Sequence, residues 1–327
     1  MEATARRSGI APLDLFTFSG QLNPLEYAIL ATVAYADVFD YPLTRPQLHR
    51  YLHNLVADLD EIRKLLDQGG LVPGNLSLHA GFVTLPGREH LVDRRLHAGG
   101  LAARLIPHAA HYGKQLGRLP FVRMVALTGS LAMENVADNA DFDYFILAQS
   151  GRLWTCRAAC LLLRRAAKLR GYSLCPNFIV STDRLVLHQR DIYTAHELTQ
   201  MIPLAGLDLY WELRRLNAWS DEFLPNSLGL PTEPWVHSLL PAPEQKFTLI
   251  KNAAELMLHH PIGDRLEGWE MRRKIQRFEQ RGGASLETFF SADWCQGHFD
   301  RHGERTLMAY RQRLENLPAP STSDIHG

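Results

Sequence analysis

The stretch that decides the fold runs from Val125-Ala-Leu-Thr-Gly129-Ser130 to Asp141-Phe-Asp143-Tyr-Phe-Ile-Leu147, with ten residues between its two parts. The first part predicts a buried strand that breaks at the Gly-Ser pair into a short helix. The second part predicts another strand, on which the alternation of side chains turns Asp141 and Asp143 to the same side.

Two carboxylates on one face of a strand repel each other, and burial raises the cost of keeping both ionised. A hard divalent cation such as Mg²⁺ relieves that cost by taking both as oxygen ligands. The turn at Gly129-Ser130 would present backbone N–H groups and a hydroxyl, which suits phosphate oxygens. The alternative is a solvated strand edge, but the apolar run Tyr144-Phe-Ile-Leu147 favours a buried strand. The sequence therefore predicts a site for a metal-bound nucleoside triphosphate.

This arrangement resembles the signature of the DNA-polymerase-β-like nucleotidyltransferase superfamily, in which an apolar strand, a Gly-Gly or Gly-Ser pair and a spacer precede Asp-x-Asp in a second strand. The resemblance covers residues 122–148. It implies an α+β fold with a mixed sheet, and transfer of a nucleoside monophosphate from a nucleoside triphosphate to an acceptor hydroxyl, with pyrophosphate leaving. In that scheme Asp141 and Asp143 are the catalytic residues and hold one or two Mg²⁺ ions, or Mn²⁺ in their place. Gly129 and Ser130 would position the triphosphate.

The superfamily completes its site with a third carboxylate on a later strand, and this chain departs from that pattern. The next expected strand, Leu174–Val180, carries Asn177, whose neutral amide oxygen would bind a second metal ion only weakly. Asp183, Asp191 and Glu197 follow as candidate replacements. The departure leaves open a site with a single metal ion, and also a catalytically inactive member of the superfamily.

A basic helix is expected between these two strands, from Leu153 to Leu169. No acidic residue lies between Arg152 and Arg170. Because a guanidinium binds phosphate oxygens through two hydrogen bonds, one arginine of this helix could reach the triphosphate. Arg157, one turn from the helix start, is the candidate, and the alternative is a solvated helix face.

The composition of the chain and its breaks at proline and glycine predict several domains. We expect flexible tails at 1–20 and 318–327, a winged-helix-like domain at 21–96, the catalytic domain at 97–190 and a helical domain at 191–317. The first domain would contain helices at Leu25–Phe39, Arg45–Leu52 and Ala57–Gln68, and then a hairpin from Leu71-Val72 to Gly81–Leu85. Thr44 is the expected N-cap of the second helix. The segment from Ala195 to Leu198 also resembles bacterial proteins of unassigned activity that pair a winged helix with this catalytic domain.

The charge pattern limits the partners. The chain has 35 basic and 35 acidic residues, so it lacks the basic excess that binding to an extended nucleic acid requires. The would-be recognition helix carries Asp58, Asp60, Glu61 and Asp67, which phosphates would repel. We therefore expect this domain to contact a protein or to orient a substrate. The acceptor itself, a small molecule, a protein side chain or an RNA end, has no readable motif.

Four cysteines without zinc or disulfide spacing favour a reducing cytoplasm, and no apolar run approaches the length of a membrane span. The main functional hypothesis is thus a cytoplasmic, magnesium-dependent nucleotidyltransferase. The alternative is a nucleotide-sensing regulatory protein, in which the winged helix binds nucleic acid or protein and the transferase domain is inactive.

Overall fold

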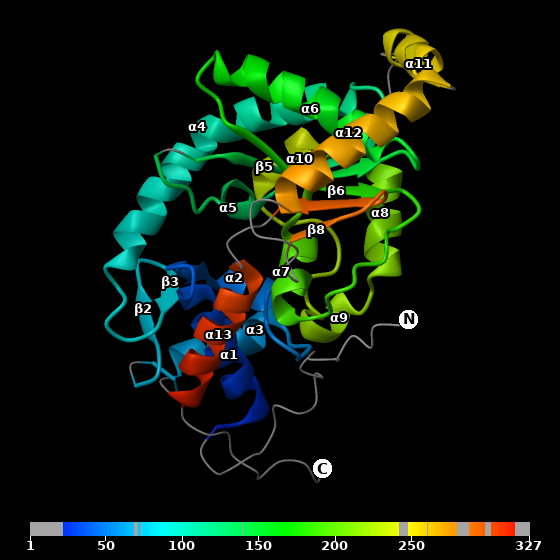
Figure 1. Cartoon of the computed structure of the whole chain (residues 1–327). Helices are drawn as coiled ribbons and strands as arrows, with labels where there is room; N and C mark the ends of the chain where they lie inside the picture. Colours follow the sequence, from blue (N-terminus) through cyan, green and yellow to red (C-terminus); the bar gives the residue numbers. More distant parts are fainter. Residues whose placement is uncertain are drawn as a thin grey trace, which may run out of the picture.

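The computed structural model of the chain describes residues 22–68, 71–72, 74–138, 140–241, 248–259, 261–279, 288–297 and 302–317. Within these ranges the protein consists of thirteen helices and two sheets (Figure 1). The expected α+β class is therefore confirmed. The tails expected at 1–20 and 318–327 lie outside the described residues.

A six-stranded sheet in the order β7-β4-β5-β6-β9-β8 forms the centre of the protein. Its strands are β4 (Val122–Thr128), β5 (Phe142–Ala148), β6 (Leu174–Ser181), β7 (Ile202–Ala205), β8 (Thr288–Phe290) and β9 (Trp294–Gly297). β5 and β6 run parallel and are connected through α6 (Leu153–Lys168), whereas the other neighbouring pairs are antiparallel. The two strands expected from residues 125–147 thus lie next to each other in the interior of the sheet.

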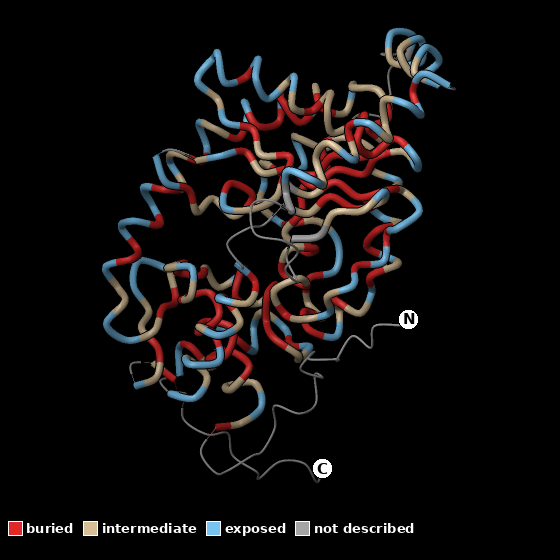
Figure 2. The backbone as a smooth tube through the Cα atoms, viewed as in Figure 1, coloured by how far each residue is buried: buried red, intermediate tan, exposed pale blue. Residues whose placement is uncertain are grey.

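Alternate side chains of the strands enter two separate cores. On β5, Tyr144 and Ile146 join a core with α4 (Leu91–Gly117) and α6, while Phe145 and Leu147 join a core with α7 (Ile192–Gln200) and α8 (Leu207–Leu216). α12 (Ile262–Glu279) packs on α6, and Figure 2 shows the strands as a buried layer between the helices. Because successive side chains alternate, Asp143 lies on the same face of the sheet as Phe145.

The first part of the chain, residues 22–85, has its own core and is referred to below as the N-terminal unit. Its elements are α1 (Pro24–Asp37), β1 (Leu43–Thr44), α2 (Arg45–Arg50), α3 (Leu59–Asp67), β2 (Ser77–His79) and β3 (Phe82–Thr84). The three strands form an antiparallel sheet in the order β1-β3-β2. Thr44 is the N-cap of α2, and its hydroxyl accepts a hydrogen bond from the Gln47 N–H at 3.3 Å, so that prediction is confirmed. The hairpin begins at Ser77 and not at Leu71.

The region after residue 190 differs from the expected helical domain. It does contain α7, α8, α9 (Ser220–Phe223), α10 (Pro234–Leu239), α11 (Thr248–Met257), α12 and α13 (His302–Glu315), but β7, β8 and β9 from the same region join the central sheet. Pro203 is tolerated in β7 because that strand lies at the sheet edge, where a missing N–H breaks no ladder. α8 starts only after Gly206, whose φ of +70° separates it from β7.

Contacts between distant parts of the chain join the N-terminal unit to the sheet domain. Arg50 is buried, and its Nη2 donates to the carbonyl oxygens of Thr199, Ser227 and Gly229 at 3.3, 3.4 and 3.1 Å. The last described helix, α13, packs on α1, as Figure 1 shows with the red and blue ends of the colour scale side by side. The space between unit and sheet is therefore bordered by elements from both ends of the chain.

Candidate functional site

The turn after β4 brings Gly129 and Asp143 into close contact. Thr128, the last residue of β4, pairs with Asp143 of β5, and the chain then enters the four-residue helix α5 (Gly129–Ala132). Gly129 has a φ of +69°, and a Cβ at this position would lie 2.6 Å from Oδ2 of Asp143. Glycine is required here both for its backbone conformation and for the approach of the carboxylate. The exposed Ser130 follows directly.

Asp141 and Asp143 differ in their exposure to solvent. Asp141 is exposed and immediately precedes β5, whereas Asp143 is partly buried and lines a cavity. The pKa of Asp143 is raised to about 7, mainly by burial and in addition by the negative charge of Asp141, while a hydrogen bond from Cys175 opposes the rise. The pair is thus a site where negative charge lacks compensation, which is the condition a bound cation would relieve.

Glu197 is a third acidic residue of this site, near Asp143. It lies on α7 and lines the same cavity as Asp143. Burial raises the pKa of Glu197 to about 7, and the charge of Asp143 contributes to the rise. Asp191 instead caps α7 by accepting from the Thr194 N–H at 2.8 Å, and Asp183 accepts from the Ser150 hydroxyl. Of the three candidate replacements, only Glu197 lines the cavity.

Two other expected site residues, Asn177 and Arg157, do not contribute a described side chain to the cavity. Asn177 is in β6, but its side chain lies outside the described part of the chain. The residue of β6 that pairs with Asp143 is Cys175. Arg157 hydrogen-bonds Cys295, and Cys295 belongs to the core on the α6 side, whereas its neighbours Trp294 and Gln296 line the cavity. Arg157 therefore lies on the opposite face of the sheet from Asp143, and its assignment to triphosphate binding is wrong.

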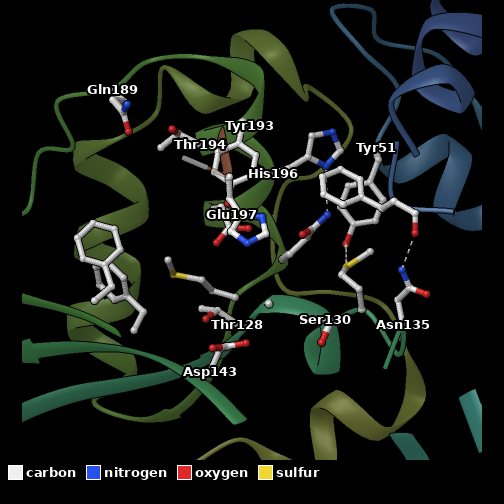
Figure 3. A pocket seen from close by; sticks show the side chains of 18 of the residues that line it. Tyr51, Thr128, Ser130, Asn135, Asp143, Gln189, Tyr193, Thr194, His196 and Glu197 are labelled. Atoms are coloured by element: carbon white, nitrogen blue, oxygen red, sulfur yellow. Dashed lines mark hydrogen bonds between the residues drawn. The ribbon is translucent and has the colours of Figure 1, made fainter. Parts of the chain in front are cut away.

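The cavity has a volume of about 720 Å³ and lies between the sheet and the N-terminal unit. Figure 3 shows Asp143 and Thr128 on its floor, Glu197 and His196 projecting from α7, and Tyr51 at one side. The N-terminal unit supplies an aromatic wall, which we define as Tyr35, Phe39, Tyr41 and Tyr51. Two contacts close this side, from Asn135 Nδ2 to the carbonyl oxygen of Phe39 at 3.0 Å and from the Tyr51 hydroxyl to the Met133 sulfur at 3.7 Å.

Sequence reasoning missed this wall. A tyrosine within an apolar helix such as α1 is indistinguishable from a core residue until the helix is docked. His196, next to Glu197, also belongs to the boundary: its Nε2 lies 3.2 Å from Nε2 of His53, and the Tyr35 ring stacks on it with centroids 4.2 Å apart. Burial lowers the pKa of both histidines, so this contact joins two neutral rings.

The described residues contain no group of three or more His, Cys, Asp and Glu side chains arranged to hold one metal ion. A cation held by the paired aspartates would therefore take its remaining ligands from water or from a bound phosphate. This is how Mg²⁺ commonly sits in phosphoryl-transfer sites, with one or two carboxylates and several other oxygens. The two aspartate carboxylates therefore fit a metal ion that is already bound to the phosphates of a nucleotide.

Replacing Gly129 with alanine is expected to weaken binding of magnesium and nucleotide about tenfold or more, whereas Gly151→Ala is expected to leave binding unchanged. The two glycines have φ angles of +69° and +70°, so both substitutions incur the same backbone strain. Only at position 129 does the new Cβ meet Asp143, because nothing lies within 4 Å at position 151. Equilibrium dialysis with Mg²⁺ and a non-hydrolysable ATP analogue measures the difference, and equal losses would contradict it.

None of the described helices combines the length and apolar character needed to cross a bilayer. Comparisons of the chain with models of protein families, with curated proteins and with solved structures gave no match.

Proposed function

We propose that the chain is a metal-dependent nucleotidyltransferase of the polymerase-β-like kind, which transfers a nucleoside monophosphate to a hydroxyl of its acceptor. The observation that carries the proposal is the meeting of Asp143 and Gly129 at the floor of the cavity, with the charge of Asp141 near enough to act on Asp143. Three supporting features are the raised pKa of Asp143, the glycine turn beside it and the size of the cavity, which lies in the range of small-molecule sites.

Asp141 and Asp143 would hold magnesium, because they are the paired oxygen donors at the site. The bound metal would supply positive charge to the attacking and leaving oxygens. Thr128, Gly129 and Ser130 would orient the phosphate chain beside them, since all three line the cavity. In the reaction the acceptor oxygen bonds to the α-phosphorus, the bond to the departing pyrophosphate breaks and the hydroxyl proton is released.

The N-terminal unit would serve as a winged-helix-like module that orients the acceptor. Its helices and three-stranded sheet follow the order expected of such a module. On α3, Asp60, Glu61 and Asp67 are exposed, which opposes contact with phosphates, while Tyr35 and Tyr51 of the same unit line the cavity. These placements favour a role in substrate binding over one in nucleic-acid binding.

The proposal is tested with the full chain and each of the four ribonucleoside triphosphates. Mass spectrometry of the nucleotide retained after rapid gel filtration, with Mg²⁺ and with EDTA, identifies the base. Pyrophosphate release is then measured with fractions of a bacterial extract as acceptor source. We expect retention of one nucleotide that depends on the metal, and release of pyrophosphate with at least one fraction. Absence of both with every nucleotide would overturn the proposal.

A further inference from the structure

The charges that line the cavity are unusual for a site that handles phosphates. Among its described lining residues, Asp143 and Glu197 are the carboxylates, and no lysine or arginine is present. Arg50 and Arg95 contact the rings of Tyr51 and Tyr41, but neither lines the cavity. Arg50 donates to backbone carbonyls, and Arg95 pairs with Glu134 at 3.4 Å. The cavity is therefore acidic, and a triphosphate would depend on divalent cations that enter with it.

The second carboxylate has no partner of its own. Within the described part of the chain, Glu197 makes no hydrogen bond and no ion pair through its side chain, although it is buried deeply enough for its pKa to rise. Figure 3 shows it projecting from α7 toward the middle of the cavity. Glu197 is partly buried, and a carboxylate withdrawn from water without a partner costs free energy. It therefore marks a place where a ligand can supply the missing positive charge.

The surroundings of Glu197 define the rest of that ligand. Glu197 lines the same cavity as Tyr35 of the aromatic wall and as Asp143. Its charge raises the pKa of Tyr35, and the charge of Asp143 raises the pKa of Glu197. Tyr35, Phe39 and Tyr51 present aromatic surface to the cavity. Aromatic rings bind apolar groups, and their faces also attract cations.

We propose that the acceptor is a small, mainly apolar molecule with a protonated amine, which Glu197 binds while the aromatic wall holds the apolar body. The proposal rests on the proposed function, because it assigns the acceptor half of the same cavity. A phosphorylated or carboxylated acceptor, or the end of a nucleic acid, would place negative charge beside Glu197 with no lysine or arginine among the described lining residues to balance it.

The test compares three probes that share one body and differ in charge: 2-(2-naphthyl)ethylammonium, 2-(2-naphthyl)ethanol and 2-naphthylacetate. Their affinities for the full chain are measured by calorimetry at pH 7.5 in EDTA, without nucleotide. We expect the ammonium to bind about tenfold or more tightly than the alcohol, and the carboxylate to bind weakest. In Glu197→Gln the advantage of the ammonium over the alcohol should disappear while the affinity for the alcohol stays.

A matched control is Glu222→Gln, because Glu222 is exposed on α9 and does not line the cavity. This variant should keep the preference for the ammonium. Equal binding of the three probes, tightest binding of the carboxylate, or a preference that survives in Glu197→Gln would overturn the proposal. These measurements need neither metal nor nucleotide, so a chain that binds the ammonium but neither retains a nucleotide nor releases pyrophosphate would refute the transferase function and not the amine site.

Discussion

Asp143→Asn is expected to lower the rate of metal-dependent pyrophosphate release about 10³-fold without unfolding the chain. Asparagine keeps the shape of the side chain beside Gly129 but removes the negative charge that would bind the metal. A neutral amide binds a hard cation weakly, so the loss should appear both in the rate and in the affinity for Mn²⁺, measured by electron paramagnetic resonance.

Asp138→Asn provides the control for this variant. Asp138 lies just before the same strand, but its side chain is 88% exposed, and Nε2 of His97 lies 4.0 Å from its Oδ1. The same change of charge at that position should leave the rate and the affinity for Mn²⁺ within about twofold of the parent, since an exposed charge is screened by solvent. If both variants kept full activity, Asp143 would have no catalytic role and the transferase proposal would fail.

The parts of the fold that could be predicted from sequence are those with strong local signals. β4 is an apolar strand that ends at Gly-Ser, and β5 is an apolar strand that begins within Asp-x-Asp. β4 starts three residues before the expected Val125, and β5 is shifted by one residue from the expected Asp141–Leu147. α6 begins at Leu153 as expected, and Thr44 caps α2. In each case the physical cause is short-range, either a run of apolar side chains or a cap that satisfies free backbone N–H groups.

The strands that sequence missed depend on distant partners. β7 has four residues and β8 has three, which is too short for a periodic pattern to be detected. β7 forms because it pairs with β4, and β9 forms because it pairs with β6. Pairing across such distances depends on tertiary structure, which a reading of local propensity does not contain.

The assignment of Arg157 to triphosphate binding and the failure to single out Glu197 have a related cause. The basic composition of α6 was apparent, but a crossover helix covers one face of a sheet and the sequence alone did not show whether Asp143 shares that face. Glu197 was one of three acids without a distinguishing local pattern. The contact of α7 with the turn after β4 accompanies the place of Glu197 at the cavity, and the rings of the N-terminal unit line the same cavity from a distant part of the sequence. Which helix faces the site is therefore a tertiary property.

The metal-free protein is expected to lose stability as the pH rises from about 4 to about 7, and Asp143→Asn is expected to reduce that loss. The pKa values of Asp143 and Glu197 are raised to about 7 from ordinary values of 3.8 and 4.5. In this pH range the folded state therefore holds more protons than the unfolded state, and rising pH favours unfolding. Above about pH 7 both carboxyls are ionised in both states, and the full penalty remains.

The expected contribution of Asp143 to stability is large enough to be measured as a change in melting temperature. A shift of one pKa unit corresponds to about 1.4 kcal/mol, but partial exposure and the mutual influence of the two acids reduce the net contribution of Asp143 to about 1–2 kcal/mol. In EDTA at pH 8, calorimetry should therefore give Asp143→Asn a melting temperature about 2–5 °C above that of the parent chain, whereas at pH 4 the two should agree within about a degree. Adding Mg²⁺ at pH 8 should stabilise the parent chain and not the variant, because only the parent has the charge that the ion neutralises. If the variant were less stable than the parent at pH 8 in EDTA, Asp143 would already be compensated within the protein, and its site would not require a cation.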